Sequence, residues 1–461
     1  MHKSFKLSQK IIQQLYEQSP QLQKLRTAIS NFEHTKGTIN IKGLIGSSLS
    51  FVLTDAFKTA KQPFLLIFND KEEAAYHLND LEQMIGEKDV LFYPGSYRRP
   101  YQIEETDNAN VLLRAEVLNR INSRKKPAVI VTYPDALFEK VVTRRELDKN
   151  TLKIKIEDSL SLDFLNEVLF EYKFKRVDFV TEPGEFSVRG GIVDVFSFSN
   201  DEPYRLEFFG DEVESIRTFD VETQLSLEKL NKITIIPNVE NKFLDESRES
   251  FLQYIASNTL IFNSDIDILL DRLDSFFEKA TEAFSKLSTE IKHAEPKALF
   301  VDSTLFKNEL EAFSLIIGGN PSQKSIQEEI QFNTRPQPSF NKKFDLLIES
   351  LNEQEKAGFT NYIFCSTEQQ AQRFHDIFDE VGKKVHYKTV VYSLFQGFID
   401  VDLKITCFTD HQIFERYHKF HVKNGYSKKQ AITLKELTRL DIGDYVTHMD
   451  HGVENLEAYK K

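Results

Sequence analysis

Cysteine is scarce in this chain of 461 residues, which contains two residues of this type. Cys365 and Cys407 form neither a zinc-ligand spacing nor a disulfide framework, so we expect a reducing, cytoplasmic environment. Long apolar runs are missing as well. Residues 64–68 form an apolar run, but this run is far shorter than the roughly 20 residues that cross a bilayer. Residues 1–18 lack the apolar core of a signal peptide, so we expect no contact with a membrane.

An excess of positive charge is also lacking. The chain has 59 Lys and Arg against 71 Asp and Glu, which gives a formal net charge of −12. Binding of duplex DNA depends on neutralising phosphates with Lys and Arg, so this balance argues against a large nucleic-acid face. We expect weak or absent DNA contact, although a basic strip at residues 173–176 leaves a local contact open. The length predicts three or four domains.

Recognisable catalytic motifs are absent. The sequence contains no HExxH and no GxSxG, and its histidines are scattered. His418 and His421 lie three residues apart, which is compatible with two metal ligands, but this spacing alone is more typical of surface positions. We therefore predict no catalytic residue and no metal site.

One stretch resembles a phosphate-binding loop without its lysine. Residues 41–57 read IKGLIGSSLSFVLTDAF: an apolar strand, a turn with Gly43 and Gly46, and an apolar helix. Ser47 and Ser48 stand where a working loop has the Lys that holds the β and γ phosphates and the Ser or Thr that holds magnesium. We predict a degenerate, non-functional loop and no cofactor, the glycines serving only a tight strand-to-helix turn. A weak anion site at the helix start is the alternative.

Strand and helix patterns alternate in residues 1–151, which predicts a parallel sheet covered on both faces. Residues 152–237 read as a helix followed by antiparallel strands with Gly190-Gly191 and Gly210-Asp211 as turns, a small inserted α+β module. Residues 239–320 look mostly helical, with one late apolar stretch. A further α/β unit follows a linker at 318–325. The expected elements of the first part are strands at 38–41, 64–68, 90–92 and 128–132 and helices at 71–85 and 108–121.

The strand at residues 204–209, YRLEFF, carries an unusual outward face. Side chains alternate along a strand, so Tyr204, Leu206 and Phe208 should face the core and Arg205, Glu207 and Phe209 the solvent. If the neighbouring strand pairs with this one, Arg189 joins the same surface. Arg beside an exposed aromatic ring is typical of a binding interface. The alternative is that Phe209 is covered by the same chain and that the arginines pair with Glu182, Glu185 or Glu207.

Three segments together carry a family resemblance. GLIGSSLSFVLTDAF, GEFSVRGGIVDVFSF and PYRLEFFGDEVESIRTFDVETQLS resemble the N-terminal half of bacterial transcription-repair coupling factors, a module similar to the excision-repair subunit UvrB. The resemblance covers residues 38–453 and is most specific at 184–226. UvrB has an intact Gly-Lys-Thr loop and a long aromatic hairpin. This chain lacks the lysine and leaves little room for a hairpin after residue 93, so the coupling factor is the better match.

The resemblance implies a fold of α/β class with several units. A degenerate P-loop, RecA-like and UvrB-like parallel-sheet domain is split between residues 1–151 and 238–325. A small α+β domain at residues 152–237 is inserted into it, and a small α/β domain follows at 326–424. Residues 425–461 resemble a linker and the incomplete start of an RNA-polymerase-interacting domain.

The resemblance also implies a function. In the family the inserted domain binds UvrA, the damage-recognition subunit, and the contact residues fall on Arg189, Arg205 and Phe209. The chain would then be a non-catalytic recruiter that links stalled RNA polymerase to nucleotide excision repair. DNA translocation would reside in motor domains that this chain does not include, and RNA polymerase would bind only the full-length protein. An ATP-dependent, UvrB-like subunit that binds damaged DNA is the alternative.

Overall fold

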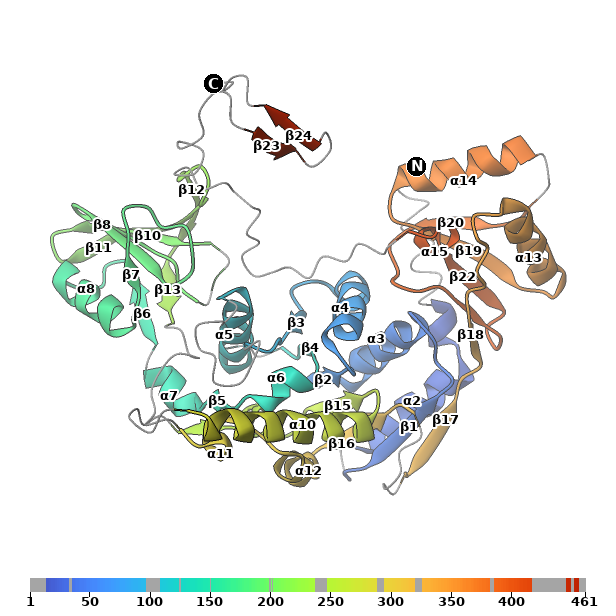
Figure 1. Ribbon diagram of the computed structural model, residues 1–461, viewed down its shortest axis with the longest axis horizontal. Coiled ribbons are helices and arrows are strands. Elements are labelled where there is room, and N and C mark those ends of the chain that lie inside the picture. The colour runs from blue at the N-terminus through green and yellow to red at the C-terminus, as the bar shows by residue number, and fades with distance from the viewer. Residues whose placement is uncertain are drawn as a thin grey trace.

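A computed structural model describes most of the chain, in several stretches of residues. Its centre is a parallel sheet with helices on both faces (Figure 1). A smaller unit with a mostly antiparallel sheet lies at one end, on the left of the view, and a third unit with a mixed sheet lies at the other end. The described residues are 14–32, 35–96, 108–123, 126–149, 151–198, 200, 202–236, 247–287, 294–319, 326–381, 385–416, 445–448 and 452–455.

The central sheet has seven strands in the order β17-β1-β16-β15-β2-β4-β3, and each neighbouring pair is parallel. The predicted α/β class with a parallel sheet is therefore confirmed, and the four strands expected before residue 150 are all present. The strands are β1 Thr38–Lys42, β2 Phe64–Ile67, β3 Val90–Phe92, β4 Val129–Thr132, β15 Leu260–Asn263, β16 Ser314–Ile317 and β17 Glu328–Gln331.

Helices cover both faces of this sheet, which explains why a central strand such as β2 is a continuous apolar run. In β2, Leu66 joins a core with the helices of one face and Leu65 joins a core with those of the other. The expected helices at 71–85 and 108–121 are confirmed. The first face carries α2 Pro20–Asn31, α3 Ser48–Ala60 and α4 Lys71–Ile85; the second carries α5 Asn108–Ser123, α6 Pro134–Phe138, α10 Ile266–Ser285 and α12 Ser303–Leu310.

The expectation that residues 239–320 are mostly helical is wrong in one respect, because β15 and β16 lie in this segment, inside the sheet. Both are runs of four residues buried on two sides, and periodicity cannot distinguish such a run from a buried helical turn. β17 also pairs with β1, although it follows residue 325, where we place the start of the third unit. A division that keeps the sheet whole assigns β17 to the first unit.

The inserted unit is a six-stranded sheet in the order β12-β11-β10-β9-β8-β7. Its expected helix is present as α8, which starts after Ser161 and packs Leu165 and Leu169 onto the inner face of the sheet. The two expected glycine turns are confirmed, with φ of 60° at Gly190 and 63° at Gly210. The elements are α8 Leu162–Glu171, β7 Lys175–Arg176, β8 Glu185–Arg189, β9 Ile192–Val195, β10 Tyr204–Phe209, β11 Glu212–Phe219 and β12 Ser226–Leu230.

Short strand pairs join the units. β6 (Leu152–Lys155) pairs with β13 (Lys232–Ile235), so the chain enters and leaves the inserted unit through one two-stranded ribbon. β5 (Val141–Val142) pairs with β14 (Arg248–Glu249) where the chain returns to the central domain. Both antiparallel pairs bring together segments from the two sides of the insertion.

The third unit has a five-stranded mixed sheet in the order β18-β21-β22-β19-β20, on which Cys365 and Cys407 are buried free thiols. A separate hairpin of β23 and β24 follows, within the segment expected to be strand-like. Among the described residues, no helix is both long and apolar enough to cross a membrane. The elements are β18 Thr334–Pro336, α13 Phe344–Lys356, β19 Thr360–Cys365, α14 Glu368–Val381, β20 Lys388–Val391, β21 Phe398–Asp400, β22 Ile405–Thr409, α15 Asp410–Ile413, β23 Tyr445–His448 and β24 Gly452–Asn455.

Candidate protein-binding surface

The outer face of the six-stranded sheet brings the predicted arginines together. Residues directly opposite one another in an antiparallel sheet share a face. Asp194 on β9 is opposite Arg205 on β10, and Arg189 on β8 stands two residues beyond the residue that pairs with Asp194. All three side chains therefore project from one face, away from α8.

Asp194 organises this face, and the sequence analysis did not single it out. Its side chain is fully buried and accepts hydrogen bonds from Arg205 Nε at 2.7 Å and Arg205 Nη2 at 2.9 Å. Arg189 Nη2 donates to the same carboxylate. The bonds to Asp194 are the main cause of the raised pKa of Arg205. A charged residue within the apolar stretch IVDV is the sequence signal that could have indicated this centre.

Phe209 is the most exposed large apolar side chain among the described residues, at 79%. Tyr204, Leu206 and Phe208 are buried, so the predicted alternation along β10 is confirmed, even though a bulge interrupts the pairing between Glu207 and Phe208. The alternative that the chain itself covers the Phe209 ring is therefore wrong. The ring stands next to the Gly210 turn, at the open end of the sheet.

Both arginines pair with Asp194, which was not among the partners suggested by the sequence. Glu207 pairs with Arg217 and accepts from Ser215, whereas Glu185 accepts from the turn at residues 181–182. Arg205 also donates to the Gln224 carbonyl, and only 15% of its side chain is exposed. The Arg189 side chain is 39% exposed, so it is the more accessible cation of the two.

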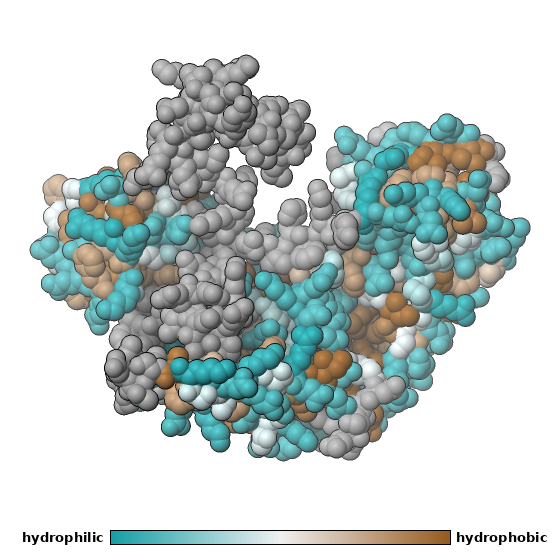
Figure 2. Space-filling model, viewed as in Figure 1, coloured by the Kyte–Doolittle hydropathy of each residue, from teal (hydrophilic) through white to brown (hydrophobic). Residues whose placement is uncertain are grey.

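Phe179 is a second exposed ring on this face that the sequence analysis missed. The Arg189 guanidinium lies 5.2 Å from the centre of the Phe179 ring, which is 59% exposed. Phe179 lies in the loop between β7 and β8, where alternation gives no prediction. Apolar residues are visible among polar ones on this unit, at the left of Figure 2. Of the nine conspicuously exposed large apolar side chains in the described part, six belong to it: Phe164, Phe170, Phe179, Phe209, Leu225 and Leu227.

The degenerate phosphate loop forms the expected tight turn from β1 to α3. Gly43 and Gly46 have φ of 75° and 59°, a region that favours glycine. Ser47 and Ser48 are fully buried, and the Ser48 hydroxyl both donates to the Ile45 carbonyl and accepts from the Ile45 amide. The loop therefore keeps the geometry of its type without an exposed side chain that could hold a phosphate at the lysine position.

A buried Ser, His and Asp lie beside this loop, yet their hydrogen bonds do not form a catalytic triad. Ser50 Oγ donates to Asp80 Oδ2 at 3.2 Å and lies 2.8 Å from His77 Nδ1. Asp80 therefore bonds the serine, whereas the carboxylate of a catalytic triad bonds the histidine. Burial lowers the pKa of His77 to about 3 and raises that of Asp80 to about 7. All three groups are inaccessible to a substrate.

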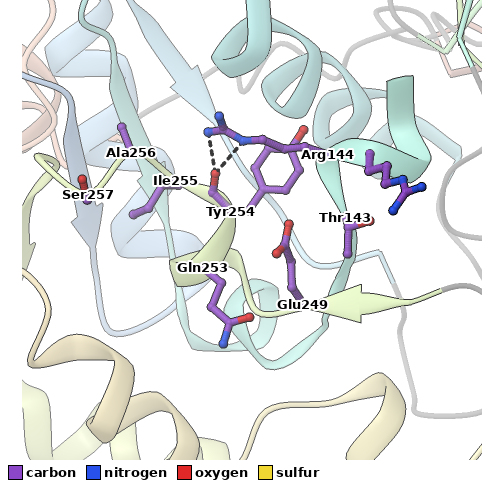
Figure 3. Close-up of a pocket in the computed structure, with 9 residues that line it drawn as sticks. Thr143, Arg144, Glu249, Gln253, Tyr254, Ile255, Ala256 and Ser257 are labelled. Carbon is purple, nitrogen blue, oxygen red and sulfur yellow. Dashed lines mark hydrogen bonds between the residues drawn. The ribbon is translucent and has the colours of Figure 1, made fainter. Parts of the chain in front are cut away.

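An open cavity of about 460 Å³ lies where the chain returns from the inserted unit (Figure 3). Arg144 lies over the Tyr254 ring and donates from Nε and Nη2 to the Tyr254 carbonyl, so its guanidinium already has partners within the chain. Burial raises the pKa of Glu249 on the same wall. No group of three metal-ligating side chains is present in the described ranges. His418 and His421 lie outside them.

Comparisons with known proteins point to the same unit. The family model described as the UvrB interaction domain matches residues 152–240, which include α8 and the whole six-stranded sheet. The chain is 23% identical over 521 residues to the transcription-repair-coupling factor of Bacillus subtilis (strain 168), covering 94% of this chain and 44% of that protein. The corresponding protein of Staphylococcus aureus (strain USA300) is 23% identical over 488 residues, with 90% and 41% covered.

This chain thus spans less than half the length of the curated relatives it matches. Within that span, the similarity extends over nearly the whole chain and includes all three folded units. The resemblance found in the sequence is confirmed: the chain is similar to the N-terminal region of the transcription-repair-coupling factors, and its residues 152–240 match the UvrB interaction domain family.

Proposed function

We propose that this chain is the recruiting, non-catalytic part of a transcription-repair coupling factor and that the outer face of its six-stranded sheet binds UvrA. The single observation that carries the proposal is the exposed Phe209 ring on the same face of the sheet as guanidinium groups that a buried carboxylate holds in place. The match of this unit to the UvrB interaction domain supports it.

The surface has the physical properties of a binding hot spot. Arg and aromatic side chains are enriched at such sites because they combine apolar area with directed hydrogen bonds. The two bonds from Arg205 to Asp194 fix its planar group, and Arg189 is held between Asp194 and the Phe179 ring. Side chains that are already ordered lose less conformational entropy when a partner binds.

The three predicted residues have different parts in this proposal. Phe209 is the apolar anchor, because its ring is almost fully available to a partner. Arg189 faces acidic groups of UvrA with its exposed portion. Arg205 mainly positions the face, since most of its side chain is enclosed by Asp194, the Phe219 ring and the Gln224 carbonyl.

A titration of UvrA against the purified chain tests the proposal. Phe209→Ala should weaken binding by about 2 kcal/mol, the range of a central hot-spot residue. Phe164→Ala is the matched control, because Phe164 is also an exposed ring of this unit, at 50%, but lies on α8, which covers the opposite face of the sheet. Equal affinities of Phe209→Ala and the wild type, with unchanged circular dichroism, would refute the assignment of this face.

The other activities of a coupling factor are assigned elsewhere in this proposal. ATP-driven translocation and binding of RNA polymerase belong to the more than half of the longer relatives that this chain does not match. The chain works in the cytoplasm and contributes the UvrA contact alone. A pull-down that recovers UvrA but no RNA polymerase is the expected result.

A further inference from the structure

The degenerate phosphate loop is in direct contact with the third unit. The Ser47 amide donates to the Gln396 carbonyl at 3.1 Å, and the Gln396 amide donates to Ser47 Oγ at 3.2 Å. A Cβ atom on Gly46 would lie 3.0 Å from the Gln396 carbonyl oxygen. A peptide group from residue 396 is therefore seated at the start of α3, against the loop.

Two further backbone groups of the loop, the Ile45 amide and the Gly43 carbonyl, are also bonded within the chain. The Ile45 amide donates to Thr334 Oγ1 at 2.9 Å, and Thr334 Oγ1 in turn donates to the Gly43 carbonyl at 2.8 Å. Backbone amides of this kind, at the start of a helix, are the groups that bind phosphate in an active loop. Here the amides of residues 45 and 47 are already bonded to the segment that follows β17 and to the third unit.

A buried carboxylate on α4 accepts a hydrogen bond from the neighbouring amide, that of Phe395. Asp80 Oδ1 on α4 accepts from the Phe395 amide at 3.1 Å, and the Tyr392 hydroxyl donates to the Asp80 carbonyl at 3.4 Å. Ser47 and Asp80 thus bind the two successive amides of residues 395 and 396. Both side chains are fully buried, so water cannot replace these bonds at low cost.

Aromatic contacts surround the polar ones. The Phe395 ring stacks on Tyr76 at 5.1 Å and meets His77 edge-on at 4.9 Å. Phe398, from β21, packs edge-on against Phe51 of α3 at 6.1 Å. One continuous core includes side chains of α3, α4 and the strands of the third unit.

We propose that the phosphate loop has become an internal docking socket, in which residues 393–397 occupy the place of a nucleotide phosphate and lock the third unit onto the central domain. The Gln396 carbonyl oxygen supplies the negative end of a dipole where an anion would bind. A lysine at position 47 would have no space, because Ser47 is fully buried against Gln396. The contacts are made by the chain itself, so the proposal expects the third unit to stay on the central domain without a nucleotide.

Hydrogen exchange of the whole chain, read by mass spectrometry, tests the joint. The amides of residues 395 and 396 should be strongly protected in the wild type. Ser47→Ala removes the acceptor of the Gln396 amide, and exchange in residues 393–397 should accelerate about tenfold. Ser339→Ala is the control, because the Ser339 hydroxyl is exposed and donates to Asn341 Oδ1, two residues further along the chain. Unchanged exchange in Ser47→Ala, or no protection in the wild type, would overturn the proposal.

Calorimetry with ATP and magnesium gives a second, independent readout. The Ser47→Lys/Ser48→Thr variant restores the side chains of an active loop, but the socket proposal expects no binding while residues 393–397 are seated. Binding accompanied by faster exchange of residues 393–397 supports competition for one place. Micromolar binding with those residues still protected contradicts the proposal. If this variant does not fold, the Ser47→Ala experiment decides alone.

Discussion

Asp194 shows how a single buried charge can determine the arrangement of a whole surface. A carboxylate loses several kcal/mol of hydration on burial and is tolerated only where charge-assisted hydrogen bonds replace the water. Arg205 supplies two such bonds and Arg189 supplies another. Each guanidinium is consequently directed by Asp194; Arg205 is largely enclosed, and Arg189 keeps an exposed portion. The buried Asp194 thus sets the geometry of the arginines, and the exposed side chains of this face are the ones available to a partner.

The first prediction concerns this carboxylate. Asp194→Ala leaves two cations without their partner and should lower the local free energy of unfolding of the six-stranded sheet by about 3 kcal/mol. Glu207→Ala, which breaks the partly exposed pair with Arg217 on the same face, should cost less than about 1 kcal/mol. Hydrogen exchange of the β9 and β10 amides in the intact chain measures both. Equal effects would mean that Asp194 is not the organising group.

Asp80 provides a pH-dependent prediction. Burial raises its pKa from the ordinary 3.8 to about 7, despite bonds from Ser47, Phe395 and Ser50 that lower it. The folded state therefore holds a proton that the unfolded chain releases, and this group's stabilising contribution is complete below 3.8 and is lost as the pH rises to about 7. Asp80→Asn should thus be more stable than the wild type at about pH 8, with little difference at about pH 4.

Thermal unfolding of the two proteins across this range measures the difference. The comparison cancels the titration of every other group, because both chains share them. His77 does not complicate it, since burial lowers its pKa to about 3 and keeps the ring neutral. A constant difference in stability at all pH values would show that Asp80 stays charged in the folded state.

At the level of elements, the sequence predicts the helices and strands whose apolar residues form a local pattern. The helix α4 has the expected bounds, because its apolar residues recur with a helical period, Asp70 caps its start and Gly86 follows its end. β15 and β16 have no such pattern, since apolar residues fill both faces. Only the pairing of these strands with β1 and β2, which lie about 200 residues or more earlier in the chain, makes them strands.

A core substitution in β16 tests that placement. Ile316 is fully buried at a central position of the seven-stranded sheet, so Ile316→Ala should destabilise the chain by about 3 kcal/mol through lost contacts and a residual cavity. Ile268→Ala is the matched control, because Ile268 lies on α10 with 41% of its surface exposed. The midpoint of urea unfolding measures both, and a mild effect at Ile316 would argue against a central strand.

The sequence predicts those parts of the candidate binding surface that follow from a local pattern. Strand alternation placed Arg205 and Phe209 on one face, and a two-residue turn added Arg189. It could not identify Asp194, whose role depends on the register between β8, β9 and β10. Phe179 lies in a loop and was missed for that reason. The contact of Ser47 with Gln396 joins residues about 350 positions apart, which no local pattern encodes.

At the scale of the whole molecule, the candidate protein-binding surface belongs to a unit that is packed firmly on the central domain. One apolar core extends from the central sheet into the inserted unit, through side chains such as Leu65 and Leu206. A second core extends from the central sheet into the third unit, through side chains such as Phe51 and Phe398. The central domain therefore carries both smaller units by packing of apolar side chains.

The charge of the whole chain gives the last prediction. A net charge of −12 repels duplex DNA, and the one strip considered from the sequence offers only Lys173, Lys175 and Arg176 as exposed cations in the described structure. Three phosphate contacts would support only weak binding, so fluorescence anisotropy with a labelled duplex should give a dissociation constant above about 10⁻⁴ M at physiological salt. Lys175→Glu/Arg176→Glu should leave the titration unchanged. Micromolar affinity that falls steeply with added salt and is lost in this variant would instead assign the strip a role in holding DNA near the face that we propose binds UvrA.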